Sequence, residues 1–123
     1  MSGGDGGGAA SRPGPGVHRV VAPAGAIADE LLAHGWDVGL VPAARSDDEL
    51  WDGLVAALDL PRWFGRNLDA LDEALADLAG PTALVLASWW TYATARPERW
   101  DGLLRLLTER SAEPPPLLVV LAD

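Results

Sequence analysis

Apolar and polar positions repeat along the chain with two different periods, and the two patterns alternate. Short apolar or β-branched runs bounded by glycine, proline or polar residues predict strands at residues 17–21, 36–41, 82–87 and 117–121. Apolar residues at helical spacing predict helices at residues 26–34, 46–60, 67–79 and 100–110. This alternation predicts an α/β fold with a mainly parallel sheet packed by helices, although the short first segments can also pair differently.

Two of the predicted helices begin at residues that favour helix starts. Ser46 followed by Glu49 has the spacing of a capping box, in which each side chain satisfies a free backbone N–H group. Asn67 has a residue type that caps helix N-termini, so the next helix is expected to start there. Residues 61–66 then form the loop that joins the two helices.

A group of aromatic residues surrounds the end of the third predicted strand. We expect a loop that contains Trp89, Trp90 and Tyr92, and Trp100 begins the helix that follows. These side chains form either a second recognition patch or the closed end of a small core, and we favour the packing interpretation.

Composition favours one folded domain. A chain of 123 residues with 49% hydrophobic residues and six tryptophans can bury a single core of useful size. Residues 1–16 are glycine-rich and cannot bury apolar surface, so we expect a disordered tail there. The sequence shows neither the apolar stretch of a signal peptide nor a membrane span, which predicts a cytoplasmic protein. The absence of cysteine excludes disulfides and cysteine-based zinc sites.

The charge balance favours a basic partner. The chain has 18 acidic and 9 basic residues and a formal net charge of -9. Phosphates would be repelled by this excess, so direct binding to nucleic acid is not expected. Acidity alone is also compatible with a protein that is merely soluble.

Leucines and carboxylates occupy opposite faces of the helix that starts at Asn67. The leucines share one face: Leu68, Leu71, Leu75 and Leu78. The other face gathers four carboxylates that should all meet solvent: Asp69, Asp72, Glu73 and Asp77. Like charges at this spacing repel, and a cationic partner would relieve the repulsion. A phosphate-binding ribonuclease site supplies such cations, although a solvated helix face has the same pattern.

The loop before this helix adds large aromatic side chains. Residues 61–66 place Trp63, Phe64 and Gly65 next to the acidic helix, and at least one of the two aromatics is expected to belong to the core. An exposed aromatic beside paired charges resembles a binding hot spot.

Loop and helix together carry a family motif. Residues 60–71 read Leu-Pro-x-Trp-Phe-Gly-x-Asn-Leu-Asp-Ala-Leu, which resembles the signature of barstar-type ribonuclease inhibitors. The resemblance covers residues 36–123 and leaves residues 17–35 as an N-terminal β-α extension. It implies a three-stranded parallel sheet packed by helices. The implied activity is tight, non-catalytic occlusion of a basic ribonuclease inside its producer, by a chain that is monomeric when free.

The resemblance also implies which residues bind the nuclease. Trp63 would lie over the nuclease's site, and Gly65, Asn67 and Asp69 would complete the binding loop and the first helical turn. Glu73 would be the central carboxylate.

Several positions depart from the family pattern. The best-known member has Asp where this chain has Glu73 and Trp where it has Asp72, and Arg66 replaces an acidic residue. These departures bear on which partner is bound more than on the inhibitor role, and Asp72 is kept in the expected binding surface. Glu109 aligns with a peripheral acidic contact or is a solvated helix end.

Two other functions stay open. An enzyme would use clustered carboxylates as acid and base or as metal ligands. His18 and His34 lie outside the acidic helix, however, and there is no HExxH, GxSxG or phosphate-binding glycine motif. We therefore expect no catalytic residue, no metal and no cofactor, and we expect His34 to contact the carbonyls at its helix end. The other alternative is an immunity or adaptor protein that turns the same surface to a different basic protein.

Overall fold

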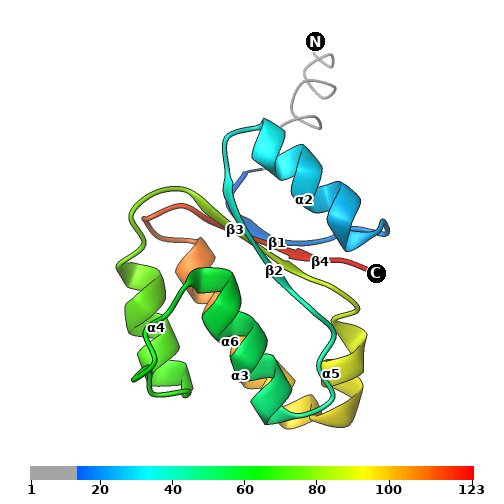
Figure 1. Ribbon diagram of the computed structural model, residues 1–123, viewed down its shortest axis with the longest axis vertical. Helices are drawn as coiled ribbons and strands as arrows, with labels where there is room; N and C mark the ends of the chain where they lie inside the picture. Colours follow the sequence, from blue (N-terminus) through cyan, green and yellow to red (C-terminus); the bar gives the residue numbers. More distant parts are fainter. Residues whose placement is uncertain (1–13) are drawn as a thin grey trace.

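Strands and helices follow one another as the hydrophobic pattern predicts, with one additional helix (Figure 1). The computed structural model describes residues 14–123, so most of the tail predicted at residues 1–16 lies outside the described residues. The elements are β1 (Gly16–Arg19), α2 (Ala24–Ala33), β2 (Asp37–Val41), α3 (Asp47–Leu58), α4 (Leu68–Ala76), β3 (Thr82–Leu86), α5 (Trp90–Ala95), α6 (Pro97–Ser111) and β4 (Leu117–Leu121).

All strands of the sheet are parallel, and their order is β1-β4-β3-β2. The predicted α/β architecture is confirmed, but the sheet has four strands, so the three-stranded count that the family resemblance implied is wrong. The additional strand is β1, which pairs with β4 from Gly16 opposite Leu118 to Arg19 opposite Leu121. Backbone groups along that side of β4 need partners, and β1 supplies them. The segment expected as an N-terminal extension thus contributes to the same sheet.

Helices cover both faces of the sheet because β3 and β4 are buried along their whole length. Successive side chains of each strand point to opposite faces. One face meets a core shared with α3, α4 and α6 and contributes Leu84, Leu86, Leu117, Val119 and Leu121. The other face packs against α2 and contributes Ala83, Val85, Leu118 and Val120. Figure 1 shows α2 alone on its side, with α3, α4, α5 and α6 together on the other.

The start of α3 is capped as the sequence predicts, with one shift. Ser46 Oγ accepts a hydrogen bond from the Glu49 N–H group at 3.2 Å. The Glu49 carboxylate accepts from the N–H group of Arg45, at 2.8 Å, rather than from that of Ser46. The box therefore spans one residue more than the usual pattern.

The other end of α3 is fixed by a close contact with β2. A Cβ atom at Gly39 would clash with the carbonyl oxygen of Ala57, so the missing side chain lets the helix lie directly on the strand. Asp59 then ends the helix in the left-handed region, with φ 53°. The loop at residues 61–66 consequently starts from a fixed point.

The loop expected after β3 is wrong, because Trp90–Ala95 form α5. Tyr92 and Trp100 are buried, with 4% and 6% exposed, and their burial holds this segment against the core. The packing interpretation of the aromatic group is confirmed for these two residues. Trp90 is 55% exposed. The pattern predicted a loop because a helix of six residues with one buried position has too little periodicity to recognise.

An aromatic stack connects β1 to the larger core. The Arg19 guanidinium lies 5.2 Å from the ring centroid of Trp89, and Trp89 stacks on Trp100 with their centroids 5.4 Å apart. Val17 also packs against this core. The first strand is therefore joined to the fold by side chains as well as by its backbone.

We predict that a chain beginning at Val21 is less stable than one beginning at Gly14. The shorter chain loses the backbone ladder to β4, the half-buried Val17 and the Arg19–Trp89 contact, which together should lower the free energy of unfolding by about 2–4 kcal/mol. Urea unfolding followed by tryptophan fluorescence measures the difference. Equal unfolding midpoints would show that β1 is not integral to the fold.

Candidate partner-binding site

Asn67 and Gly65 shape the junction between the loop and α4. The Asn67 side chain accepts a hydrogen bond from the Ala70 N–H group at 2.8 Å, so the predicted N-cap is confirmed. Its amide nitrogen also donates to the carbonyl oxygen of Gly65. A Cβ atom at Gly65 would lie only 3.2 Å from that amide nitrogen, which explains why glycine fits here. Both residues fix the backbone on which the neighbouring side chains stand.

The two aromatics of the loop take opposite roles. Phe64 is half-buried and packs against Trp51 of α3, with their ring centroids 6.0 Å apart. Trp63 is 84% exposed. The expectation that at least one aromatic belongs to the core is thus met by Phe64, and Trp63 is free to contact a partner. A tryptophan this exposed leaves a large apolar area in water, which a binding surface would explain.

The predicted leucine face of α4 is buried at Leu71 and Leu75 but not at Leu68, which is 38% exposed at the start of the helix. The carboxylates of α4 are not equivalent either. Leu71 and Leu75 are fully buried, whereas Asp69 and Glu73 are exposed. Asp72 is half-buried and accepts a hydrogen bond from Arg110 Nε of α6 at 2.7 Å.

The expected set of four free carboxylates on this face is therefore wrong for Asp72, because α6 brings Arg110 against it. The Arg110 side chain is only 21% exposed, and its guanidinium also lies 3.5 Å from Glu113. Arg110 thereby ties α4 to α6 and neutralises one carboxylate of the helix. Asp69 and Glu73 remain as the outward charges of the first two turns, and Asp77 caps the helix C-terminus.

Glu109 stands on α6, one residue before Arg110, and is exposed. On a helix, a residue two positions after the buried Leu107 points away from the core. The structure places Glu109 on the helix that supports α4, without a contact that joins it to Asp69 or Glu73 in the described part of the chain.

A further ion pair lies beside the loop. Arg66 Nη2 donates to Asp52 Oδ1 of α3 at 2.7 Å, and Arg66 has a φ of 29°, in the left-handed region. Both side chains are exposed, so the pair adds little to stability. Its consequence is that the Arg66 charge is compensated within the free chain. Sequence analysis missed this pair because no local pattern relates positions on a helix and a distant loop.

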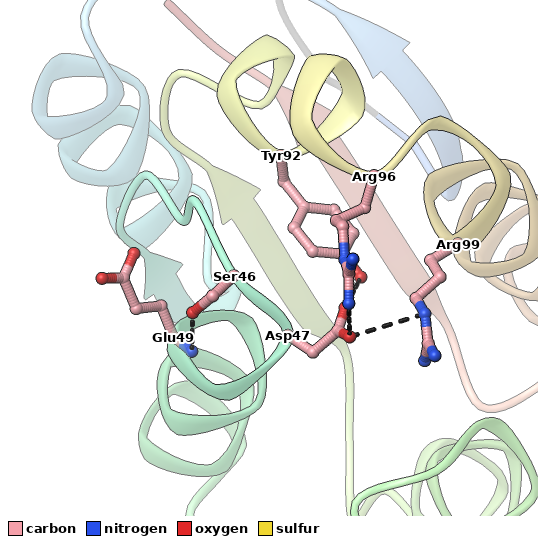
Figure 2. A network of polar contacts seen from close by, with 6 residues as sticks. All are labelled: Ser46, Asp47, Glu49, Tyr92, Arg96 and Arg99. Carbon is pink, nitrogen blue, oxygen red and sulfur yellow. Dashed lines mark hydrogen bonds and ion pairs between the residues drawn. The ribbon is translucent and has the colours of Figure 1, made fainter.

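A second polar cluster joins α3 to the α5–α6 corner (Figure 2). The Tyr92 hydroxyl and Arg96 Nη2 each donate to the Asp47 carboxylate at 2.6 Å, and Arg99 Nε lies 3.4 Å from it. Asp47 is the first residue of α3, where the helix dipole also favours a negative charge.

These contacts shift the pKa of the residues involved. The hydrogen bond from Arg96, followed by the one from Tyr92, lowers the pKa of Asp47 to about 2 from an ordinary value of 3.8. Burial and the nearby Asp47 anion raise the pKa of Tyr92. Asp47 is thus held as an anion and Tyr92 as a neutral donor. Groups that satisfy one another in this way are not poised for proton transfer, and the cluster is structural.

Among the described residues, the lining of the cavity at the amino ends of the strands includes no cluster of reactive side chains. This cavity has a volume of about 340 Å³ and is lined by Gly14, Pro15, His34, Gly35, Trp36, Pro81 and Pro116. His34 is the titratable side chain there, and its Nδ1 donates to the carbonyl oxygen of Glu30 at 2.9 Å, as predicted from its place at the helix end. Over residues 14–123, no three side chains gather as a metal site would require. Nor does any helix in that range have the length and apolar character needed to cross a membrane.

Fold and site together define an α/β protein that presents an exposed tryptophan beside an acidic helix. The family model described as Barstar (barnase inhibitor) matches residues 41–122, two thirds of the chain. The chain therefore belongs to the barstar family, whose members are inhibitors rather than enzymes. β1, α2 and all of β2 except Val41 lie outside the matched residues. A comparison with curated proteins gives no match.

We predict that Asp47→Asn removes a pH-dependent part of the stability. Because the folded pKa is lowered, the stabilisation from the Asp47 anion is complete above about pH 4 and is lost as the pH falls through about 2. Water screens the contacts, so the difference in unfolding free energy between the two proteins should be about 1 kcal/mol at pH 7 and should fall steeply as the pH approaches 2. Urea unfolding at several pH values measures it. Asp29→Asn, at an exposed position of α2, is the control, and a pH-independent difference for Asp47→Asn would contradict this assignment.

Proposed function

We propose that this protein inhibits a basic ribonuclease by covering its active site with Trp63 and the first two turns of α4. The observation that carries the proposal is the 84% exposure of Trp63 directly before a helix whose Asp69 and Glu73 face solvent. The barstar family match supports the same role.

Electrostatics support a cationic partner. Within residues 14–123, neither Asp69 nor Glu73 has a cationic side chain within 4.0 Å, whereas Asp72 is paired with Arg110. A ribonuclease that binds the phosphates of RNA presents Arg, Lys and His side chains, and carboxylates can take the place of those phosphates. The net charge of -9 would also speed the encounter with a basic protein.

Each residue of the proposed surface has its own task. Trp63 covers apolar surface of the nuclease, Asp69 and Glu73 pair with its cations, and Gly65 and Asn67 hold the loop in shape. Asp72 contributes through Arg110, which sets the position of α4 on α6. Glu109 is proposed as a peripheral contact.

The proposed setting is the cytoplasm of the cell that makes the nuclease, where the free inhibitor is a monomer and binds neither RNA nor membrane. The mode of action needs no cofactor, metal or catalytic residue, because occlusion is enough to stop cleavage.

An immunity or adaptor role against a different basic protein is the alternative. The departures at Arg66, Asp72 and Glu73 favour it, because they alter the binding face where the family's best-known member contacts its nuclease. Immobilised full-length chain, exposed to lysate and culture medium of the source organism, should capture the partner. An RNA-cleavage assay on the captured protein separates the two roles: activity that the chain suppresses supports the inhibitor, and a captured basic protein without such activity supports the adaptor.

We predict that Glu73→Ala weakens inhibition of the captured ribonuclease at least about 100-fold, because an interfacial cation then loses its partner. The thermal unfolding midpoint should stay within a few degrees, since Glu73 is exposed. The matched control is Asp29→Ala, which removes an exposed carboxylate from α2 on the opposite face of the sheet. Inhibition that is unchanged by Glu73→Ala would remove Glu73 from the central position.

Association should also depend on salt. We predict that raising NaCl from 0.05 to 0.5 M slows association with the ribonuclease by about tenfold or more, because exposed charges are screened. The dissociation rate should change far less, since charges buried in the complex are screened less. Stopped-flow tryptophan fluorescence measures both rates, and salt-independent association would contradict electrostatic steering.

A further inference from the structure

Arg62 stands beside Trp63 at the tip of a hydrogen-bonded turn. The Phe64 N–H group donates to the carbonyl oxygen of Pro61 at 2.9 Å, which closes a β-turn with Arg62 and Trp63 as its two central residues. Both are exposed. Phe64 anchors one side of the turn on Trp51.

Most other arginines of the described chain are occupied by contacts within the protein. Those with a partner are Arg19 on the Trp89 ring, Arg66 with Asp52, Arg96 and Arg99 with Asp47, and Arg110 with Asp72. Between residues 14 and 123, four arginines have no carboxylate within 4.0 Å, namely Arg19, Arg45, Arg62 and Arg105, and of these Arg19 is occupied by the Trp89 ring. Of the other three, Arg62 is the one in the turn that carries Trp63.

A free positive charge at this position conflicts with a partner that is only basic. Arg62 would be brought against the rim of a cationic site, and like charges facing each other in an interface oppose binding. The conflict disappears if the partner presents a carboxylate at that point. Arginine and tryptophan are also the residue types that most often dominate binding energy. Arg66, by contrast, needs no such partner, because Asp52 already compensates it.

We infer that the partner ribonuclease carries an acidic residue at the rim of its basic site, and that this residue pairs with Arg62 in the complex. The inference rests on the proposed function. Each partner then contributes both positive and negative charges to the interface. Carboxylates of α4 pair with the cationic site, and Arg62 of the turn pairs with the acidic rim. Arg62 becomes a residue that selects among basic nucleases, because one without the acidic group would be repelled.

Reversing the charge at Arg62 tests this inference, because the dissociation constant should rise if Arg62 faces a carboxylate and fall or stay unchanged if it does not. Arg62→Glu and Arg105→Glu each lower the formal net charge by two, and Arg105 is an exposed residue of α6. Against a basic ribonuclease, added negative charge alone should speed association, so Arg105→Glu should leave the dissociation constant unchanged or smaller. If Arg62 faces a carboxylate, Arg62→Glu should instead raise the dissociation constant at least about tenfold, and Arg62→Gln should raise it by a smaller factor.

The measurement uses full-length chains and the ribonuclease captured from the source organism, with binding followed by stopped-flow fluorescence and inhibition by RNA cleavage. Equal or tighter binding by Arg62→Glu overturns the inference. Glu73→Ala is measured in parallel. If Glu73→Ala weakens inhibition while Arg62→Glu does not, the acidic rim is wrong and the inhibitor role stands. If the unsubstituted chain does not suppress RNA cleavage by the captured protein, the proposed function itself fails. Equal unfolding midpoints for all variants exclude misfolding as the cause.

Discussion

The burial of β3 and β4 on both faces is the constraint on which the rest of this structure depends. A strand without a solvent face needs helices above and below it, and neighbours on both edges. α2 covers one face, whereas α3, α4 and α6 cover the other, so the loop and the acidic helix lie on the same side as the larger core. The connection from β1 to β2 crosses the sheet in the direction opposite to those from β2 to β3 and from β3 to β4. Right-handed crossovers then place α2 on the opposite face.

Hydrophobic periodicity predicted the elements that bury a continuous stripe or run, which include α3, α4, α6, β3 and β4. Local chemistry was equally informative at Asn67, where the cap forms as expected. The same signals failed where periodicity is short or the decisive partner is distant. α5 has only six residues, too few for the pattern to predict a helix, and the place of β1 depends on the outer edge of β4, just over 100 residues later in the chain.

For the candidate site too, local patterns could be predicted from the sequence and contacts with distant residues could not. Sequence pattern and family motif identified the loop and the acidic helix, and the leucine face of α4 follows directly from its spacing. The pairing of Asp72 with Arg110, 38 residues away, and of Arg66 with Asp52 arises only when α6 and α3 pack beside the loop. These two pairs decide which charges of the surface are free. Helical spacing predicts the face on which a carboxylate lies, but its partner comes from tertiary packing.

The Asp72–Arg110 pair helps to fix α4 in place, whereas a different set of residues forms the surface exposed to solvent. Two buried leucines and this ion pair fix the helix, whereas Trp63, Asp69 and Glu73 make no contact that the fold requires. Exchange of the outward residues therefore leaves the scaffold nearly untouched. For the proposed binding surface, single substitutions can therefore change specificity without compensating changes in the core, so the architecture itself makes new specificities evolutionarily accessible.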